Sequence, residues 1–436
     1  MAASPASICI VTPGYLASSP RVLKEADALH EAGYRVRVVF SEGDLELLRK
    51  HDGLLLRDKP WRWSAIGWSR RRRGERLVYW RATLGYEAAR RGPAILWPVL
   101  ALAERAEGRL YSELARRAAA ESADLFIGHY PAGLAAAAGA ASAQGARLGY
   151  DAEDLHTGEN PATRAGQRRT RRIDLIERKY LQRCVHVTAA APRIADALAE
   201  RYGVSRPVVV HNVFPWADRG RLDGKTADRN GSGLSLCWFS QTIGLDRGVT
   251  DAIRAAGVLR QPVQIHLRGG LSETVKQAIL GLARESGAAV AERLHFHPPV
   301  PPMELLSRTA EHDVGLALEQ GHNTSNSLTV TNKLFLYLLA GLAIAATDVP
   351  GQRDVLATCP DAGFLYPPGD WRALASRLES WGRHPEQLRA CREAALDAAR
   401  ARWNWERESG KLLESVAAAL ARAPGGSPLR EATSAL

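Results

Sequence analysis

Short apolar runs alternate with amphipathic segments of helical length along most of the chain. The first run, "SICIVTPG" at residues 7–14, is typical of a buried strand. Val22, Ala26 and Leu29 then recur at helical spacing, and a second strand begins at Val36. The chain therefore opens with a predicted βαβ unit, whose first loop lies at the carboxyl end of a parallel strand.

The same alternation continues with "DLFIGH", "GARLGYDAED", "CVHVTAA" and "PVVVHNVFP", and after a polar, glycine-rich stretch it restarts with "LSLCWFSQ". We predict an α/β protein with two Rossmann-like domains that face a cleft. The predicted parts are residues 1–216 for the first domain, 217–234 for a linker, 235–400 for the second domain, 401–422 for a C-terminal helix that crosses back to the first domain, and 423–436 for a disordered tail.

A stretch in the second domain combines a polar start with an apolar interior. It is "TNKLFLYLLAGLAIAATDVPG", residues 331–351. We expect a helix that is apolar on every side, a break at the glycine, an aliphatic strand and a turn. Such segments belong in the middle of a parallel sheet covered on both faces, and the polar start is where a ligand could bind.

One segment, residues 59–81, interrupts the alternation in the first domain. It is "KPWRWSAIGWSRRRRGERLVYWR", in which tryptophans alternate with a run of arginines from Arg70 to Arg73. The tryptophans are Trp61, Trp63, Trp68 and Trp80. Aromatic rings beside arginines suit a membrane interface or an anionic surface, so we expect Trp61 to Arg73 to contact one. A solvated basic loop with the tryptophans packed beneath it is the alternative.

The charge of the chain favours an anionic partner. The 436 residues carry a formal net charge of +11, which suits a nucleotide, a nucleic acid or a lipid headgroup. The five cysteines are scattered without a C-x-x-C pair, so neither a zinc site nor a disulfide framework is expected. No basic N-terminal leader precedes a long apolar run, and no run approaches the roughly 18 apolar residues that span a bilayer. We therefore expect a cytoplasmic protein.

Six motifs, in this order, carry a family resemblance: "SSPRVLKEADALHEAGYRV", "DLFIGHYPAG", "YDAED", "VVHNVF", "FSQTIGLDRGV" and "NKLFLYLLAGLAIAATDVPG". They resemble GT-B-fold glycosyltransferases of the retaining family 4 type, which assemble bacterial polysaccharides and other glycans. The resemblance covers nearly the full length. It implies a nucleotide-sugar donor in the second domain and a glycan, lipid-linked or other hydroxyl acceptor in the first. It also implies retention of configuration and no metal or other cofactor.

Several donor-binding residues follow from this resemblance. Gln241 and Arg247 occupy positions where relatives offer an arginine and a lysine to the diphosphate, so only one cation is kept. Gly269, Gly270 and His297 resemble the loops that border the nucleotide base. Taken without the family, Arg247 is an ordinary surface charge.

The polar start of the second-domain helix is the other predicted donor contact. Ser327, Thr331, Asn332 and Lys333 lie where exposed backbone N–H groups, hydroxyls and one ammonium converge on a diphosphate. The alternative is that the hydroxyls only cap a helix and that the lysine is solvated.

The same stretch departs from the family pattern. Relatives carry two glutamates eight positions apart, the second of which holds the ribose hydroxyls, whereas this chain has Leu328 and Leu336. A leucine cannot accept the hydrogen bonds of a diol, so the ribose must be held otherwise or the usual donor is not bound. Glu319 is the nearest remaining carboxylate and is our substitute for the missing ribose ligand.

The first domain supplies a strand-end histidine and an open loop. His129 ends the run "DLFIGH" and matches a family position that faces the donor sugar. A histidine that only caps local backbone is the alternative. Gly14 and Ser18, in the first loop, would let the donor approach backbone amides.

Four acidic residues crowd the next strand end. Asp151, Glu153, Asp154 and Glu159 indicate acceptor hydroxyl binding or a raised pKa, with a solvated acidic loop as the ordinary alternative. They complete the predicted acceptor side.

Two function classes remain open. The first is a nucleotide-sugar-dependent glycosyltransferase in which the catalytic residues are His129, Arg247 and Lys333 and no metal takes part. The second is a non-catalytic GT-B protein that binds a glycan or a partner after losing its donor chemistry, which Leu328, Leu336 and Gln241 favour. An epimerase would need more catalytic acids and bases, and no nucleic-acid-binding motif is present, so we expect no nucleic acid partner. Peripheral contact with the inner face of the membrane is our further expectation.

Overall fold

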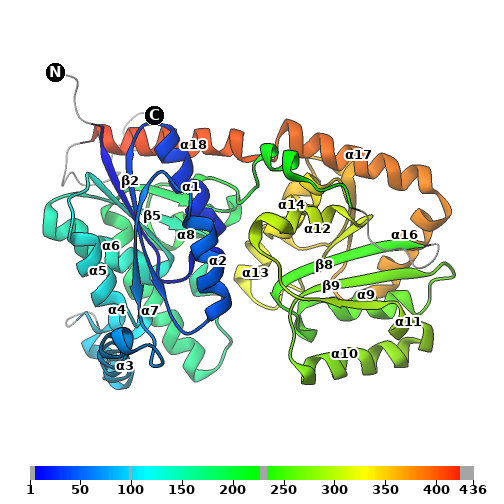
Figure 1. The fold of residues 1–436 in the computed structure, drawn as a ribbon, viewed down its shortest axis with the longest axis horizontal. Helices are drawn as coiled ribbons and strands as arrows, with labels where there is room; N and C mark the ends of the chain where they lie inside the picture. The colour runs from blue at the N-terminus through cyan, green and yellow to red at the C-terminus, as the bar shows by residue number, and fades with distance from the viewer. Residues whose placement is uncertain (1–4, 98–100, 226–232, 423–436) are drawn as a thin grey trace. The chain divides into compact units, whose positions relative to one another are not determined.

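The computed structural model describes residues 5–97, 101–225 and 233–422, and they form two units that each contain one parallel sheet (Figure 1). The first unit comprises Met1–Val210 and Ser409–Leu436, and the second comprises His211–Glu408. Residues 226–232 of the predicted linker and the whole predicted tail, 423–436, lie outside the described residues.

The sheet of the first unit has seven strands within the described residues, in the order β3-β2-β1-β4-β5-β6-β7. The strands are β1 (Ser7–Val11), β2 (Arg35–Glu42), β3 (Arg62–Gly67), β4 (Leu125–His129), β5 (Arg147–Ala152), β6 (Cys184–Ala189) and β7 (Val208–Val209). Neighbouring strands are parallel, as the alternation of apolar runs and helices predicts. All carboxyl ends of these strands therefore lie along one edge of the sheet.

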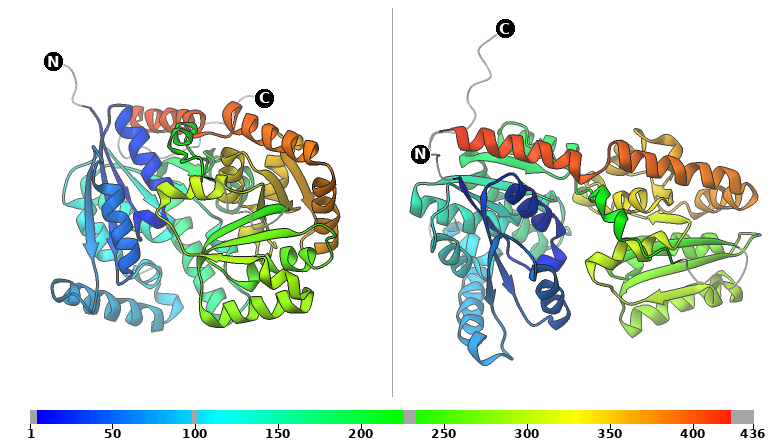
Figure 2. Two further views of the ribbon diagram at one scale, coloured as in Figure 1. Left: turned by 45° about the vertical axis from the view of Figure 1, so that its right-hand side comes forward. Right: turned by 45° about the horizontal axis from the view of Figure 1, so that its top comes forward.

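Helices cover both faces of this sheet (Figures 1 and 2). The helices of this part of the chain are α1 (Pro20–Glu31), α2 (Glu46–Leu56), α3 (Arg76–Arg91), α4 (Leu102–Glu107), α5 (Tyr111–Ala119), α6 (Tyr130–Gln144), α7 (Arg164–Tyr180) and α8 (Pro192–Tyr202), of which α3 packs on α4 rather than on the sheet. Helix α6 is rich in alanine and buried on nearly all sides, because small side chains let it pack tightly against the sheet and α5.

The prediction that residues 59–81 interrupt the alternation of strands and helices is wrong for the first part of this segment. Residues Arg62–Gly67 form β3, which pairs with β2 in parallel at the edge of the sheet. Only Ile66 of this strand is buried, so the segment lacks the apolar run that marks the central strands. Trp61 is buried as well and donates from Nε1 to Oδ1 of Asp27 at 2.7 Å, so it does not face a membrane.

The second unit repeats the architecture, with six strands among its described residues in the order β10-β9-β8-β11-β12-β13. The strands are β8 (Leu234–Thr242), β9 (Val263–Gly270), β10 (Leu294–His297), β11 (Val314–Ala317), β12 (Ala343–Thr347) and β13 (Gly363–Tyr366). The helices are α9 (Val249–Ala256), α10 (Glu273–Ser286), α11 (Ala288–Glu292), α12 (Leu305–Ala310), α13 (Thr324–Leu328), α14 (Asn332–Ala340), α15 (Pro350–Leu356), α16 (Trp371–Arg383) and α17 (Pro385–Ala401).

The stretch 331–351 forms the elements that its pattern predicts. Helix α14 is buried along nearly its whole length and ends where Gly341 takes a left-handed conformation, with φ 72°. The fully buried strand β12 follows, and the chain then turns into α15 at Pro350. A layer of this kind is rigid support for the polar residues at its start.

The last helix, α18 (Trp405–Ala421), continues from the second unit into the first. In the first unit, Ser415 Oγ lies 2.8 Å from Nδ1 of His186, and the Arg422 carbonyl accepts from Nε of Arg147 at 2.9 Å. None of the helices in the described residues is long and apolar enough to cross a membrane.

Candidate active site

Each sheet has one place where the strand order reverses, between β1 and β4 in the first unit and between β8 and β11 in the second. Loops after two such strands run to opposite faces and leave a crevice, in which ligands of doubly wound sheets bind. Gly14 follows β1 and His129 ends β4, while Gln241 lies at the end of β8 and Glu319 follows β11. Four predicted site residues therefore lie at these reversal points.

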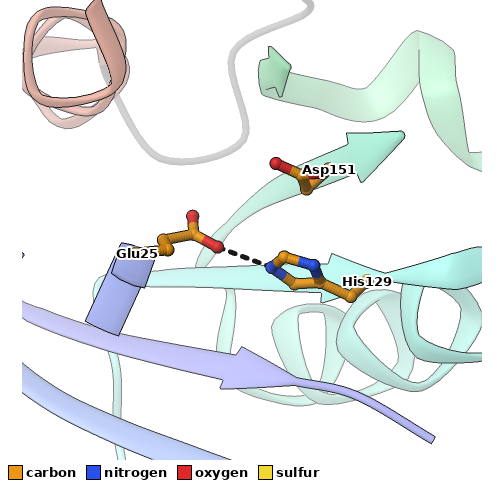
Figure 3. A group of neighbouring side chains, drawn as sticks. All are labelled: Glu25, His129 and Asp151. Atoms are coloured by element: carbon orange, nitrogen blue, oxygen red, sulfur yellow. Dashed lines mark hydrogen bonds and ion pairs between the residues drawn. The ribbon is translucent and has the colours of Figure 1, made fainter. Parts of the chain in front are cut away.

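Helix α1 and strands β4 to β6 bring together a buried charged cluster (Figure 3). Oε2 of Glu25 lies 2.5 Å from Nε2 of His129, 104 positions away in the chain. Arg21 donates from Nε to Oδ1 of Asp151 at 2.8 Å, and Thr188 donates to Oδ2 at 2.7 Å. His129 is thus held by a distant carboxylate rather than by local backbone.

The charges of this cluster support one another in spite of their burial. Burial opposes protonation of His129, but Glu25 and Asp151 outweigh it and raise the pKa of the imidazole. Burial likewise opposes ionisation of Asp151, but Arg21 and His129 outweigh it and lower the pKa of the carboxyl. The cluster is therefore a set of mutually compensated ions at the end of the sheet.

The four acidic residues of the predicted acceptor side do not share one environment. Burial raises the pKa of Glu153, as one of the two sequence-based interpretations requires. The pKa of Asp151 is lowered by Arg21, and the pKa of Glu159 is lowered through its hydrogen bond to His156, in both cases against the effect of burial. The alternative of a solvated acidic loop is wrong for Asp151, which is 2% exposed.

Glu25, His129 and Asp151 could also be considered as metal ligands. Each offers one ligand atom, and these atoms lie within 4.8 Å of one another. However, the Arg21 guanidinium already lies 2.8 Å from Oδ2 of Asp151, where it supplies the positive charge that a cation would bring. The donor set therefore fits an internal ion cluster better than a resident metal.

Sequence reasoning missed Tyr130, which directly follows His129. Tyr130 adopts φ 60°, a left-handed conformation that costs a bulky residue strain energy and is concentrated at functional sites. Its ring lies 5.6 Å from that of His156, with a tilt of 48°. A sequence motif could not have revealed this, because the strain depends on the packing of the following helix.

The first loop of the first unit is open, as expected, but its glycine is not required by the protein itself. A side chain at Gly14 would meet no atom within 4 Å, so only a ligand could exclude one there. The hydroxyl of Ser18 donates to the carbonyl of Tyr15 at 2.8 Å within a short 3-10 helix, Leu16–Ser18.

In the second unit the structure pairs two residues that the sequence placed separately. Nζ of Lys333 lies 2.7 Å from Oε1 of Glu319 and 3.3 Å from Oγ1 of Thr331. Both members of the ion pair are largely buried, with side chains 12% and 18% exposed. The second oxygen of Glu319, Oε2, is buried and has no hydrogen-bond partner among the described residues. Oε2 of Glu319 is therefore a hydrogen-bond acceptor that is held in place and that no described residue uses.

The loop after β8 approaches the end of β11 very closely. Gly248, which precedes α9, adopts φ 75°, and a Cβ there would lie 2.2 Å from the carbonyl oxygen of Leu318. Gln241 and Arg247 flank this loop and are exposed, and Nη1 of Arg247 donates to Oγ of Ser240 at 3.4 Å. Only glycine allows this approach, which places the backbone after Arg247 against Leu318, the residue before Glu319.

The remaining predicted residues at the start of α14 show little helix capping. Thr331 precedes the helix without a side-chain capping hydrogen bond, and Asn332 begins it. Ser327 donates instead to the carbonyl of Asn323 at 3.1 Å within α13. The alternative that the hydroxyl of Thr331 only caps the helix is therefore wrong.

The two leucines that replace the family glutamates lie in different environments. Leu336 is 2% exposed and lines a cavity of about 50 Å³ with Met303, Leu306 and Leu339. Leu328 is half-buried on α13. Arg221 and Ser307 line the same cavity, but the side chain of Leu336 itself offers no hydrogen-bond acceptor to a diol.

The predicted base-binding loops contain a stack of histidines. Nε2 of His297 lies 3.0 Å from Nδ1 of His266, whose ring also stacks on His295. Burial, followed by Arg268, lowers the pKa of His297 to about 4. Burial, followed by the neighbouring histidines, lowers the pKa of His266 to about 2. Gly269 and Gly270 end the adjacent strand, β9. These histidines are neutral at pH 7 and add no charge to the site.

Comparisons with known proteins agree with this architecture. Residues 21–214 match the model of Glycosyltransferase Family 4. No curated protein sequence matches the chain significantly.

Solved structures resemble the chain along almost its full length. Sucrose-phosphate synthase from Thermosynechococcus elongatus has a TM-score of 0.67 at 16% identity, covering 95% of this chain and 100% of that one. Anabaena Alr3699/HepE in complex with UDP has a TM-score of 0.65 at 14% identity, covering 94% and 99%. The E. coli trehalose-6-phosphate structure bound with UDP-2-fluoro glucose has a TM-score of 0.64 at 13% identity, covering 96% and 100%.

The family match and these folds confirm the predicted resemblance to GT-B glycosyltransferases of the family 4 type. They also confirm the α/β fold class, and the family match supports a glycosyltransferase.

Proposed function

We propose that this protein transfers a sugar from a nucleotide-sugar donor to a hydroxyl acceptor. The observation that carries the proposal is the ion pair of Lys333 and Glu319 at the reversal point of the second sheet, beside the start of α14. The structures that resemble the chain include proteins bound to UDP and to UDP-2-fluoro glucose. The donor belongs in the second unit in this proposal, and the acceptor in the first.

The diphosphate of the donor is bound by cations and by backbone N–H groups. Lys333 and Arg247 supply positive charge, Gln241 donates a hydrogen bond, and the first turn of α14, after Thr331, offers N–H groups and the positive end of its dipole. Ser327 and Asn332 complete this polar surface, and Gly269, Gly270 and His297 border the base. These groups can stabilise a departing diphosphate, so our mechanism uses no metal.

Glu319 holds the ribose in this proposal. Its Oε1 is fixed by Lys333, and its buried Oε2 has no hydrogen-bond partner among the described residues, so it can accept from a diol hydroxyl. This contact would replace the one that relatives make through a glutamate where this chain has Leu336. It answers the main departure from the family pattern.

The acceptor hydroxyl attacks from the face that the diphosphate leaves, as retention requires, and the departing diphosphate takes the proton. His129 is fully buried, so we propose that it acts as a fixed positive charge behind the site rather than as a hydroxyl ligand. Gly14 leaves space for the donor, and Asp151, Glu153, Asp154 and Glu159 shape the acceptor side.

The competing function is a GT-B protein that binds a glycan or partner without catalysis. Leu328 and Leu336 favour it, because a leucine cannot accept the hydrogen bonds of the ribose. Nucleotide binding separates the two functions.

The test is calorimetric titration of the full chain with UDP, GDP and their common sugar conjugates. We expect one nucleotide to bind, and Lys333→Ala to weaken binding about tenfold or more, because a charge-assisted contact to phosphate is lost. Glu319→Gln should weaken nucleoside diphosphates but not inorganic pyrophosphate, which has no ribose.

Lys276→Ala, on α10 of the same unit, is the matched control and should bind like the wild type. If no nucleotide binds a folded wild-type protein, the transferase proposal fails and the non-catalytic function replaces it.

The protein also contacts an anionic membrane surface in this proposal, through α3 rather than through Trp61. Leu77, Trp80 and Leu84 recur at helical spacing on α3 and are 77%, 56% and 67% exposed. Arg70 to Arg73 precede the helix and are exposed as well. An exposed apolar stripe beside arginines suits the boundary between lipid headgroups and acyl chains.

A further inference from the structure

The first unit contains a cavity of about 360 Å³ that none of the predicted roles uses fully. Three of its lining residues follow the carboxyl ends of neighbouring strands: Pro13 after β1, Tyr130 after β4 and His156 after β5. Its volume lies within the range of small-molecule sites. The cavity is therefore at the edge of the sheet where ligands of this fold bind.

The guanidinium of Arg109 lines one side of this cavity. Arg109 lies against two aromatic rings, with Cζ 5.2 Å from the centre of Trp68 and 4.9 Å from that of Tyr86. Trp68 is in turn stacked on Tyr79, at 6.0 Å and 12°. No carboxylate in the described part of the chain forms an ion pair with Arg109. The aromatic contacts fix its orientation and leave its N–H donors available.

His156, after β5, is a second cationic group that lines the cavity. His156 is 3% exposed, and its Nδ1 lies 2.7 Å from Oε1 of Glu159. Burial opposes its protonation, but the bond to Glu159 outweighs this and raises the pKa of His156 to about 9. Its other nitrogen, Nε2, is buried and has no partner among the described residues. At neutral pH, Nε2 is thus an N–H donor without an acceptor.

The rest of the lining adds to the positive potential. Arg169 is half-exposed, and its Nε lies 3.0 Å from Oε1 of Glu107. Arg109, Arg169 and protonated His156 therefore face only two lining carboxylates, Glu107 and Glu159. Helix α6 also starts at the cavity, and the side chain of its N-cap residue makes no capping hydrogen bond. All of these features favour an anion.

We propose that this cavity binds an anionic group of the acceptor, a phosphate or a carboxylate carried on a sugar, through Arg109 and Nε2 of His156. The inference rests on the proposed function, since it names the chemical class of the acceptor. It also assigns specificity to residues outside the predicted acceptor set, which has only Glu159 on this cavity. A neutral sugar would leave both donors unpaired, which would penalise its binding.

The experiment measures binding of three hexose probes to the full chain by calorimetry: hexose 6-phosphate, hexuronate and neutral hexose, with inorganic phosphate as a competitor. We expect one of the anionic sugars to bind about tenfold or more tightly than the neutral one. Which anionic sugar binds identifies the group as phosphate or carboxylate. Equal binding of all three sugars, or none, would overturn the proposal. Binding of inorganic phosphate alone would also overturn it.

Variants then test the assigned residues. Arg109→Gln and His156→Gln should each weaken the preferred anionic sugar about tenfold, while Arg109→Lys, which keeps the charge but loses the planar fork, should lose less. Arg105→Gln, an exposed change on α4, is the matched control. Unchanged affinity in both site variants would contradict the assignment.

The outcome is separable from that of the proposed function. Nucleotide titration of the same samples reports on the second unit and should be unaffected by Arg109→Gln and His156→Gln. Loss of nucleotide binding would show a wider structural defect and overturn the reading of these variants. Anionic-sugar binding in a protein that binds no nucleotide would support the subsite while rejecting the transferase.

Discussion

At the scale of single residues, pairing decides what a charged side chain can do. Lys333 and Glu319 each look like an isolated charge in the sequence, but they share a 2.7 Å contact. Asp151 looks like an open acceptor ligand and is instead compensated by Arg21. In both cases the pairing fixes one group in position. The atoms that remain without a hydrogen-bond partner are the ones that can bind a ligand.

The pair of His156 and Glu159 predicts a pH dependence of stability. The pKa of His156 is raised to about 9, so folding favours the imidazolium. The contribution is complete below the usual histidine pKa, roughly 6.5, and is lost as the pH rises through about 9. Its full size is about 3 kcal/mol, as an order of magnitude.

The check is the free energy of unfolding of wild type and His156→Gln, measured in denaturant from pH 6 to 10. We expect the difference between the two proteins to shrink as the pH rises. A difference independent of pH would show that His156 is neutral in the folded protein.

At the scale of elements, a close backbone approach and an ion pair shape the second unit. The loop between β8 and α9 meets the end of β11 at Gly248, and Lys333 of α14 pairs with Glu319 after that same strand. The elements are rigid because their apolar sides are buried, as in the face formed by Trp238, Ile265 and Leu267. Rigid strand ends hold the polar groups of the site at constant spacing.

Gly248→Ala is therefore expected to damage the proposed donor site. The change adds a left-handed penalty of about 1–2 kcal/mol and a clash with the carbonyl of Leu318. We expect a lower melting temperature and weaker nucleotide binding. Gly281→Ala, on α10, is the matched control, because a Cβ there meets nothing within 4 Å and alanine favours a helix. Equal effects of the two changes would show that the close approach at Gly248 is not needed.

At the scale of the whole molecule, charge and exposed apolar surface are unevenly distributed. Helix α3 lies away from the first sheet (Figure 2). Its apolar stripe of Leu77, Trp80 and Leu84 is exposed, whereas leucine side chains are usually buried. The formal net charge is +11. Together these features predict binding to anionic bilayers that depends on ionic strength.

Flotation with vesicles of phosphatidylglycerol and phosphatidylcholine tests this surface. We expect the full chain to float at low salt and to be released at high salt, and Leu77→Asp with Leu84→Asp to abolish flotation. Val258→Asp, an exposed apolar residue of the second unit that is 57% exposed, is the control and should float normally. Flotation that survives loss of both leucines would exclude α3 as the contact.

The sequence by itself determined the order of the strands other than β3 and their alternation with helices. Apolar runs of strand length mark every central strand, and the glycine after a buried helix marks the end of α14. These features are local, so periodicity and turn chemistry suffice to predict them. The edge strand β3 escaped prediction because it buries only one residue and has no apolar run.

Only the tertiary structure decided which of the predicted residues meet. Arg21 reaches Asp151 across 130 positions, and Arg109, Trp68 and His156 line one cavity of the first unit although they lie far apart in the sequence. No local pattern encodes such pairings, because they depend on where distant strand ends and helices pack. Burial then shifts the pKa of each group and leaves some donors without a hydrogen-bond partner. For this reason the sequence predicted the resemblance and the fold, while the chemistry of the cavity lined by Arg109 and His156 emerged from the three-dimensional arrangement.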